Sequence, residues 1–342
     1  MAAPEFLYGS TLDRLADLCA SEGWPRFTAG QLARWLYKRH IEDPARMTDL
    51  AAARRERLAQ LFGLALTPPL RESRSADGTK KYLFRTHEGH LIESAYIPDG
   101  DRATLCVSSQ AGCRMGCRFC ATGRQGLQQS LPTAEILNQI ASLPERDRLT
   151  NLVFMGMGEP LDNLDHVLQA LEILTSEWGF GWSPTRITVS TAGVVPQLRR
   201  FLDATKVHLA VSLHNPFADE RAEIMPVERA WPIAEVAEIL REYDFSHQRR
   251  VSFEYIVMSG LNDSPRHVRE LCRLLNGIKC RINLIRFHKI PDSPYFSPDE
   301  AAMVRFRDAL TAKGIQTTIR ASRGEDIQAA CGLLSTRLRN GV

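Results

Sequence analysis

The sequence lacks any segment expected to cross a membrane or to direct secretion. No apolar run approaches the ~20 residues that a membrane-spanning helix requires. The first residues, MAAPEFLYGS, do not place a basic stretch before an apolar one, as a secretory signal does. Internal repeats and low-complexity tracts are also missing. We therefore expect a folded cytoplasmic protein with no membrane partner.

Neither sign of charge dominates, because 43 Lys and Arg face 40 Asp and Glu, giving a formal net charge of +3. Such a balance does not by itself indicate a nucleic-acid-binding protein, although it permits one if basic residues cluster. Basic residues do concentrate in places: Arg34, Lys38 and Arg39; Arg54, Arg55 and Arg57; Lys80 and Lys81; Arg320 and Arg323. Most charged helix faces are merely solvated, so these groups are weak evidence for nucleic-acid binding.

Stable disulfides are not expected, because cytoplasmic thiols are kept reduced. Metal binding or catalysis is the better interpretation of cysteines that cluster. Of the eight cysteines, Cys113, Cys117 and Cys120 cluster, and five stand apart: Cys19, Cys106, Cys272, Cys280 and Cys331. A lone cysteine usually behaves as a small buried hydrophobic residue, and we expect this of Cys19, Cys272 and Cys280.

The length of 342 residues, with 44% hydrophobic and 24% charged residues, predicts one large domain and an appendage. Residues 1–75 are expected to form an N-terminal helical accessory domain, with Thr28 as the N-cap of the helix AGQLARWLYKRH. Residues 76–100 are expected to form a linking β-hairpin that turns at 87–89. The large core domain is expected to occupy residues 101–342.

Short β-branched runs alternate with longer amphipathic segments throughout the expected core. The expected strands are 104–108, 151–155, 186–190, 207–213, 250–258, 281–285 and 316–320. The expected helices are Thr133–Leu143, Leu164–Glu177, Val194–Leu202, Ile233–Tyr243, Pro265–Asn276 and Pro298–Lys313. This alternation predicts a parallel α/β sheet, either barrel-like or doubly wound, with its site at the carboxyl ends of the strands.

The clustered cysteines have the spacing C-x3-C-x2-C and follow the first of these strands directly. Thiolates are soft ligands that suit iron–sulfur clusters or zinc. Structural zinc typically takes four ligands from two C-x2-C pairs, and no second pair follows here. Three thiolates on a four-iron cluster leave one iron open, and the amino and carboxylate groups of S-adenosylmethionine (SAM) can chelate it.

Further along the chain, small or polar residues follow the ends of successive strands. Residues 156–160 (GMGEP) follow the strand at 151–155, Ser190 ends the next strand, and residues 212–214 (SLH) end the one after it. In a parallel barrel such strand ends converge on one pocket. Taken alone, the first group could be an ordinary turn, and His214 could be a core histidine.

The run TLCVSSQAGCRMGCRFCATGRQG is followed in order by FMGMGEPLDN, STAGVVP, VSLHNP and AACG. This series resembles the radical SAM superfamily and, within it, the RlmN/Cfr family of RNA adenine methyltransferases, over nearly the whole chain. The resemblance implies a partial (β/α)6 radical SAM barrel behind a small N-terminal helical domain. It implies that Cys113, Cys117 and Cys120 hold a [4Fe–4S] cluster.

The resemblance also assigns contacts with SAM to residues of the strand ends. They are Gly158, Glu159, Ser190, Ser212, Leu213 and His214. The family often has Asn at one further contact, where this sequence has His288, in NLIRFHKIP. Histidine can still hydrogen-bond adenine or ribose, and we expect His288 at the barrel mouth near Ser190 and Ser212.

Adenine ring carbons are poor nucleophiles, whereas a thiolate can take a methyl group from SAM directly. The resemblance implies that Cys331 is methylated first and then becomes covalently linked to the RNA adenine. Glu93 is implied to accept the proton of the ring carbon. Cys106 is implied to release the product, leaving a transient disulfide with Cys331 that must later be reduced.

The implied function is methylation of carbon 2 of an adenine in 23S ribosomal RNA, near the peptidyl transferase centre, and in tRNA anticodon loops. An electron donor such as flavodoxin or ferredoxin is expected as a partner, and DNA is not. Three alternatives stay open. They are a carbon-8 methyltransferase of the Cfr branch, a glycyl-radical activase, and a zinc-stabilised RNA-binding protein with no enzymatic activity.

Overall fold

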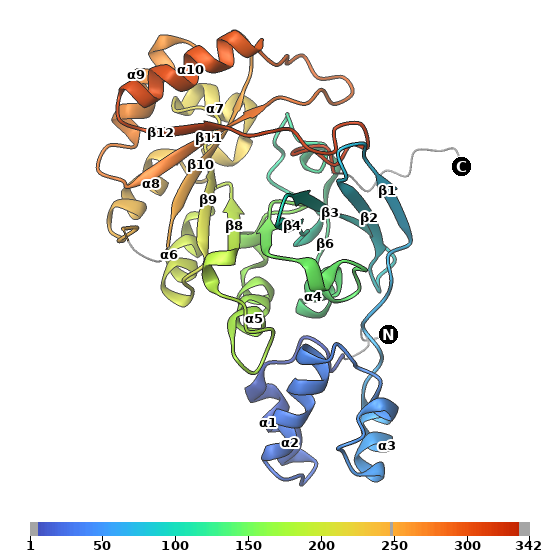
Figure 1. Ribbon diagram of the computed structural model, residues 1–342. Coiled ribbons are helices and arrows are strands. Elements are labelled where there is room, and N and C mark those ends of the chain that lie inside the picture. The colour runs from blue at the N-terminus through green and yellow to red at the C-terminus, as the bar shows by residue number, and fades with distance from the viewer. Residues whose placement is uncertain (1–5, 247–248, 335–342) are drawn as a thin grey trace.

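The structure is a computed structural model that describes residues 6–246 and 249–334, and it places a small helical lobe beneath a larger α/β body (Figure 1). The lobe contains α1 (Leu12–Ser21), α2 (Phe27–Ala33), the π-helical turn η1 (Arg34–Lys38), the 3-10 turn η2 (Pro44–Arg46) and α3 (Ala52–Leu61). Leu15, Leu32 and Leu58 of the lobe are fully buried and join the same apolar core as the α/β body.

The predicted N-cap at Thr28 is wrong. The amide of Thr28 donates to the carbonyl of Pro25 at 2.9 Å, so the chain already turns at Pro25, whose fixed φ suits a first helical turn. Thr28 therefore lies inside α2, where it is buried and accepts a hydrogen bond from Arg54 at 3.3 Å. The predicted continuous helix instead passes from α2 into the π-helical turn η1.

One ten-stranded sheet forms the α/β body, in the order β1-β2-β3-β4-β7-β8-β9-β10-β11-β12. The strands are β1 (Arg71–Arg74), β2 (Lys80–Arg85), β3 (Leu91–Asp99), β4 (Arg102–Cys106), β7 (Asn151–Phe154), β8 (Ile187–Thr191), β9 (His208–Ser212), β10 (Val251–Val257), β11 (Cys280–Arg286) and β12 (Gln316–Ile319). Neighbouring strands are parallel from β4 to β12 and antiparallel from β1 to β4. The carboxyl ends of β4 and β7–β12 therefore meet at one edge.

Helices form most of the connections between the parallel strands (Figure 1). They are α4 (Thr133–Ala141), α5 (Leu164–Thr175), α6 (Val195–Ala204), α7 (Ala218–Ile224), α8 (Ile233–Arg241), α9 (Pro265–Leu274) and α10 (Glu300–Ala312). The partial barrel of six β/α units is thus confirmed. The short helix α7 was not predicted, because ADERAEI is dominated by charged and small residues. No helix of the described ranges is long and apolar enough to cross a bilayer.

The β2–β3 hairpin forms as predicted and continues the barrel sheet. Its turn is closed by the amide of Thr86, which donates to the carbonyl of His90 at 2.8 Å, and Gly89 adopts φ 90° there. A positive φ of this size favours glycine. On its other side β3 pairs with β4, and Ala95 stands opposite Cys106. The hairpin therefore brings β3 next to Cys106, one of the two cysteines to which the resemblance assigns a catalytic role.

Candidate active site

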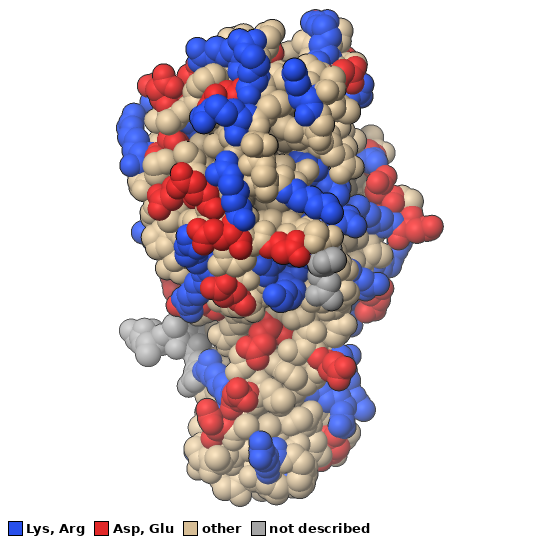
Figure 2. All heavy atoms as spheres, turned by 90° about the vertical axis from the view of Figure 1, so that its left-hand side faces the viewer, with Lys and Arg blue, Asp and Glu red and all other residues tan. Residues whose placement is uncertain are grey.

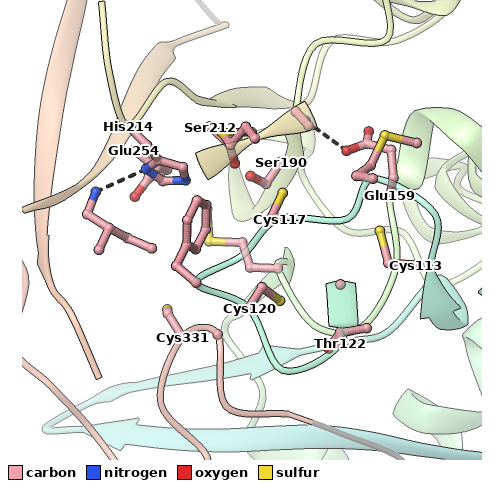
Figure 3. A pocket seen from close by; sticks show the side chains of 18 of the residues that line it. Cys113, Cys117, Cys120, Thr122, Glu159, Ser190, Ser212, His214, Glu254 and Cys331 are labelled. Carbon is pink, nitrogen blue, oxygen red and sulfur yellow. Dashed lines mark hydrogen bonds between the residues drawn. The ribbon is translucent and has the colours of Figure 1, made fainter. Parts of the chain in front are cut away.

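A cavity, about 840 Å³ in volume when the space open to solvent is included, lies at the carboxyl ends of the parallel strands. Its wall combines residues 154–156 at the end of β7, Ser190 of β8 and Ser212 of β9 with the cysteine loop. In Figure 3 these serines lie above the cysteine loop and Cys331 lies below it. The structure therefore confirms the predicted convergence of strand ends on one pocket.

Cys113, Cys117 and Cys120 all line this first cavity. Cys113 ends β5 (Gln110–Cys113), which pairs with β6 (Gly126–Ser130) in a small separate sheet that was not predicted. The pair closes the loop that carries the other two thiols. Gly123 completes this loop, because a Cβ there would lie 2.9 Å from the amide nitrogen of Cys117.

Burial controls the protonation of these three thiols. It raises the pKa of Cys113 to about 12 and that of Cys117 well above its usual value. Burial also raises the pKa of Cys120, although the amides of Gly123 and Thr122 act against it. In the absence of a bound metal centre the three thiols are therefore protonated. A metal centre that binds them as thiolates must displace their protons.

The turn after β7 packs its backbone closely on the segment that follows β4. A Cβ on Gly156 would lie 2.6 Å from the carbonyl oxygen of Val107, and one on Gly158 would lie 2.5 Å from Cβ of Gln110. Gly158 also has φ 100°, which disfavours any side chain. The turn can therefore pack this closely on the segment after β4 only with glycine at both positions.

Glu159 lines the cavity from a buried position and links two strand ends. Its carboxylate accepts hydrogen bonds from the amides of Ala192 at 2.7 Å and Leu161 at 3.1 Å. Burial raises the pKa of Glu159 to about 7, although these bonds and one from Thr191 oppose the shift. A nearby ammonium group would favour the ionised form.

Ser190, Ser212 and His214 line the first cavity, whereas Leu213 does not. Leu213 is fully buried, and its amide donates to the carbonyl of Glu254 at 3.0 Å. His214 adopts φ 57°, and its Nδ1 accepts from the amide of Ile256 at 3.0 Å (Figure 3). Burial lowers the pKa of His214 to about 3. The ring is therefore neutral and carries its proton on Nε2.

A second, larger cavity of about 1380 Å³ adjoins the first and contains the two lone cysteines. Cys106 is buried at the end of β4, and Cys331 is exposed on the segment after β12. Cys331 lines both cavities, whereas Cys106 lines only the second. Burial, followed by the nearby Cys331, raises the pKa of Cys106 to about 12. The thiol of Cys331 can thus face either cavity, whereas the thiol of Cys106 faces only the second.

Two known domain families match the chain. The ribosomal RNA large subunit methyltransferase N-terminal domain matches residues 7–64, and the radical SAM superfamily matches residues 107–274. The chain is 55% identical over 330 residues to a probable dual-specificity RNA methyltransferase RlmN of Phocaeicola vulgatus, covering 96% of this chain and 95% of the relative. The chain belongs to the RlmN family of radical SAM methyltransferases.

Other relatives of the RlmN family agree with this assignment. The dual-specificity RNA methyltransferase RlmN of Anaeromyxobacter dehalogenans is 44% identical, with 94% of this chain and 90% of the relative covered. The crystal structure of a radical SAM methyltransferase from Sphaerobacter thermophilus superposes with a TM-score of 0.91 at 42% identity, covering 98% of this chain and all of that one. This membership sets aside both the activase and the non-enzymatic alternatives.

Glu93 lines neither of the two cavities. It is buried on β3, two residues from Ala95, the strand partner of Cys106. Its carboxylate forms an ion pair with Lys81 at 2.9 Å. The structure therefore places Glu93 near Cys106 and shows it engaged with a lysine, and its role in proton transfer stays a prediction.

His288 follows β11 and lines only one of the two cavities. It lines the second cavity, whose wall includes neither Ser190 nor Ser212. The C-terminal segment accounts for this position, because Ser322 lies 3.4 Å from Nε2 and Glu325 lies 3.5 Å from Nδ1 of the ring. His288 and the two serines therefore line adjoining cavities, and their predicted proximity stays a prediction. Contact between His288 and SAM stays a prediction.

We expect His288→Asn to retain activity and His288→Ala to raise the SAM concentration needed for half-maximal turnover. One lost hydrogen bond corresponds to about 0.5–1.5 kcal/mol. Asn keeps donor and acceptor groups, whereas Ala keeps neither. Calorimetric titration of each variant with SAM, beside steady-state kinetics, measures the effect. An alanine variant that binds SAM as tightly as the wild type would show that His288 takes no part in SAM binding.

Arg221 of α7 is a residue that the sequence analysis missed. Its guanidinium is fully buried, pairs with Glu228, and donates to the carbonyls of Ala192 and Ser212, each at 2.9 Å. It therefore ties the end of β8 to the end of β9, the two strands that carry Ser190 and Ser212. No local signal could have revealed it, because a charged residue in a short charged helix usually lies in solvent.

We expect Arg221→Met to lower the free energy of unfolding by about 3–5 kcal/mol, because the substitution leaves the Glu228 carboxylate buried and unpaired. Arg199→Met is the matched control, since Arg199 pairs with Glu242 while both side chains stay about half exposed. The control should lose less than about 1 kcal/mol. Urea unfolding of both variants gives the comparison, and equal losses would contradict a structural role for Arg221.

Glu254 is a second missed residue, and here the sequence did contain a signal. It is an acidic residue within the apolar run VSFEYIV of β10, and its side chain is buried. Its carboxylate accepts from Asn283 at 2.8 Å and from Arg320 at 3.2 Å. Burial acts to lower the pKa of Arg320, but Glu254 and the two thiols raise it. Arg320 lines both cavities and so places a positive charge beside the thiols.

Proposed function

We propose that this protein methylates carbon 2 of an adenine in 23S ribosomal RNA and in tRNA, with SAM as the methyl donor. The proposal depends chiefly on the position of Cys331, which lines both the cavity with the three clustered thiols and the cavity with Cys106. A methyl acceptor that must meet SAM, RNA and a second thiol in turn needs such a position. Relatives are described as dual-specificity RNA methyltransferases.

Cys113, Cys117 and Cys120 are the residues that would hold a [4Fe–4S] cluster. The donor set fits, because three thiols line one cavity and no His, Cys, Asp or Glu groups of the described residues converge closely enough to hold a single metal ion. In a cluster each thiolate binds a different iron, so the thiols can stand further apart than around one ion. When bound together, the cluster and SAM supply an electron and a cleavable sulfonium.

The strand ends would hold SAM in the first cavity. We propose that Glu159 and the backbone of the turn at Gly156 and Gly158 receive its amino group, since they offer oxygen acceptors at the cavity wall. Ser190 and Ser212 supply hydroxyl groups across the same space, and neutral His214 has its Nε2 proton available for donation. Leu213 would contribute through its backbone, because its side chain points into the core.

Cys331 would take the methyl group on its sulfur and then carry it to the RNA adenine. The methyl carbon would first lose one hydrogen atom, for which reductive cleavage of a second SAM would supply the acceptor, and would then bond to the ring. Glu93 would accept the proton of carbon 2, and the electron left over would return to the cluster. The Cys106 thiolate would then attack the sulfur of Cys331, and the broken carbon–sulfur bond would leave its electron pair on the new methyl group. That carbon takes up one proton, and the two thiols are left as a disulfide that a dithiol must reduce.

We propose that residues 1–75 form an accessory RNA-binding domain, that 76–100 link it, and that 101–342 form the catalytic core. Basic residues of the lobe are partly engaged, since Arg57 pairs with Glu22 and Arg34 with Asp49. Figure 2 shows Lys and Arg mixed with Asp and Glu over one face, without a uniformly basic area. RNA binding would then depend on shape and on a few phosphate contacts rather than on net charge.

The proposal is tested with purified holoenzyme, a reductant such as reduced flavodoxin or ferredoxin, and SAM labelled in the methyl group. The substrates are a 23S ribosomal RNA fragment and tRNA, and their nucleosides are separated and identified by mass spectrometry. We expect labelled 2-methyladenosine from both RNAs. Labelled 8-methyladenosine would instead assign the Cfr-type reaction, and unlabelled RNA from an iron-replete enzyme would contradict the proposal.

A further inference from the structure

The segment that carries Cys331 crosses the molecule to lie against the β1–β2 turn (Figure 1). After β12 the chain runs back over the β1–β2 turn. There Gly324 and Asp326 contact residues that lie 247 to 251 positions earlier in the sequence. Nothing in the reaction scheme above uses this contact. It lies five residues before Cys331 at its nearest point.

Two aspartates, one on each segment, form reciprocal hydrogen bonds across the contact. Asp326 accepts from the hydroxyl of Ser75 at 2.6 Å and from the amide of Ala76 at 3.2 Å. In the opposite direction, Asp77 accepts from the amide of Gly324 at 2.9 Å. We call Ser75, Asp77, Gly324 and Asp326 the carboxylate clasp.

The two segments also fit together closely. A Cβ on Gly324 would lie 2.7 Å from Cγ2 of Thr79 and 2.9 Å from Cβ of Ala329, and Gly324 has φ 62°. The amide of Ala329 donates back to the carbonyl of Gly324 at 2.8 Å, which closes residues 324–329 into a compact turn. The clasp therefore holds a folded unit, and Ala329 of this unit belongs to the same small apolar cluster as Cys106.

The chain on the other side of Cys331 is held by the cysteine loop. The amide of Ala121 donates to the carbonyl of Gly332 at 2.8 Å, and the hydroxyl of Thr122 donates to the carbonyl of Leu334 at 2.6 Å. Cys331 thus lies between two anchored points, one on the β1–β2 turn and one on the cysteine loop. Its exposed side chain stands where the two cavities meet.

We propose that the carboxylate clasp positions Cys331, holding its segment so that the thiol can turn between SAM and Cys106 without leaving the barrel mouth. This inference rests on the role proposed above for the two thiols. Five residues separate Asp326 from Cys331, a tether no longer than about 18 Å when extended. Without the clasp the chain between Arg323, which pairs with Asp99, and Gly332, which the cysteine loop holds, would lose its tie to the β1–β2 turn, and the thiol would explore a larger volume.

Both clasp carboxylates are charged at neutral pH, which strengthens their hydrogen bonds. Burial acts to raise the pKa of Asp77, but the amides of Gly324 and Thr79 lower it to about 2. The hydroxyl of Ser75 and then the amide of Ala76 lower the pKa of Asp326. Removal of either carboxylate should therefore weaken the contact more than removal of a neutral acceptor would.

The test compares how readily the two thiols form a bond in clasp variants. Anaerobic holoenzyme is equilibrated with mixtures of reduced and oxidised glutathione, in which oxidation of both thiols reduces one glutathione disulfide to two glutathione molecules. After quenching with acid, mass spectrometry measures the peptide that links Cys106 to Cys331. We expect Asp326→Ala and Asp77→Ala each to lower the effective concentration of the two thiols by roughly tenfold, the effect of one charge-assisted hydrogen bond.

Two further variants serve as controls. Asp326→Asn keeps one acceptor for Ser75 and should give a smaller loss. Glu88→Ala removes an exposed carboxylate from the β2–β3 turn, at the opposite end of β2 from the clasp, and should change nothing. Equal effective concentrations in the wild type and both alanine variants would overturn the positioning role.

Hydrogen–deuterium exchange keeps the clasp testable apart from the chemistry of the thiols. Peptides that cover residues 321–332 should exchange faster in Asp326→Ala than in the wild type or in Glu88→Ala. If the wild type never forms the linked peptide, the thiol pairing of the proposed function fails while exchange still decides the clasp. Exchange at the wild-type rate in Asp326→Ala overturns the clasp whatever the thiols do.

Discussion

Cys106→Ala should leave RNA covalently attached to the protein, whereas Cys331→Ala should neither attach nor modify RNA. The difference follows from their positions, because Cys331 lines both cavities and Cys106 lines only the second. Loss of Cys331 removes the methyl acceptor, so the reaction stops before RNA becomes covalently attached. Loss of Cys106 removes the thiol that releases the product, so the bound RNA accumulates. Denaturing gels with labelled RNA, followed by mass spectrometry of the adduct, measure both outcomes.

Cys280→Ala is the control for this pair, since Cys280 lies on β11, half-buried and outside both cavities. It should methylate RNA at nearly the wild-type rate. If neither Cys106→Ala nor Cys331→Ala accumulates an adduct, the division of labour between the two thiols is wrong. An adduct in Cys331→Ala would show that another residue accepts the methyl group.

A second large effect is expected of Cys117→Ala, which should lose both its iron and its ability to cleave SAM. Cys117 lines the first cavity between its two neighbours in the motif, and two thiols do not hold a four-iron cluster with one open iron. Iron and sulfide analysis and the visible absorption of anaerobically reconstituted protein measure the cluster. Chromatography of 5′-deoxyadenosine measures SAM cleavage.

Cys272→Ala provides the matched comparison, because Cys272 lies on α9, half-buried and outside both cavities. It should keep the iron content and the SAM cleavage of the wild type. A four-iron cluster retained in Cys117→Ala would remove Cys117 from the ligand set. Loss of iron in both variants would point to general destabilisation and not to ligand loss.

The order of strands and helices could be predicted because each element carries its own local pattern. The seven predicted strands of the barrel and the six predicted helices all appear within a few residues of their expected bounds. β-branched runs and amphipathic segments are set by neighbouring residues, and packing reinforces them. The exceptions are short, namely α7, β1 and the β5–β6 pair, whose few residues have no clear periodicity.

The three clustered thiols could also be placed from sequence, because all of them lie within eight residues of each other. The strand-end residues were harder, since their convergence depends on the sheet closing as expected. That expectation was correct for Ser190, Ser212 and His214, which line one cavity. His288 lines the adjoining cavity, where Ser322 and Glu325 of the C-terminal segment lie beside its ring.

The sequence by itself determined the family, the barrel and the thiol cluster, since each of these depends on residues close together in the chain. The tertiary structure alone decided that Cys331 lies where two cavities meet and that Arg221 ties two strand ends together. It also decided that Asp77 and Asp326 hold the C-terminal segment on the β1–β2 turn. These contacts join segments that lie far apart in sequence or depend on the packing of a short helix. No periodic pattern marks them, because they depend on how loops pack after the sheet has formed.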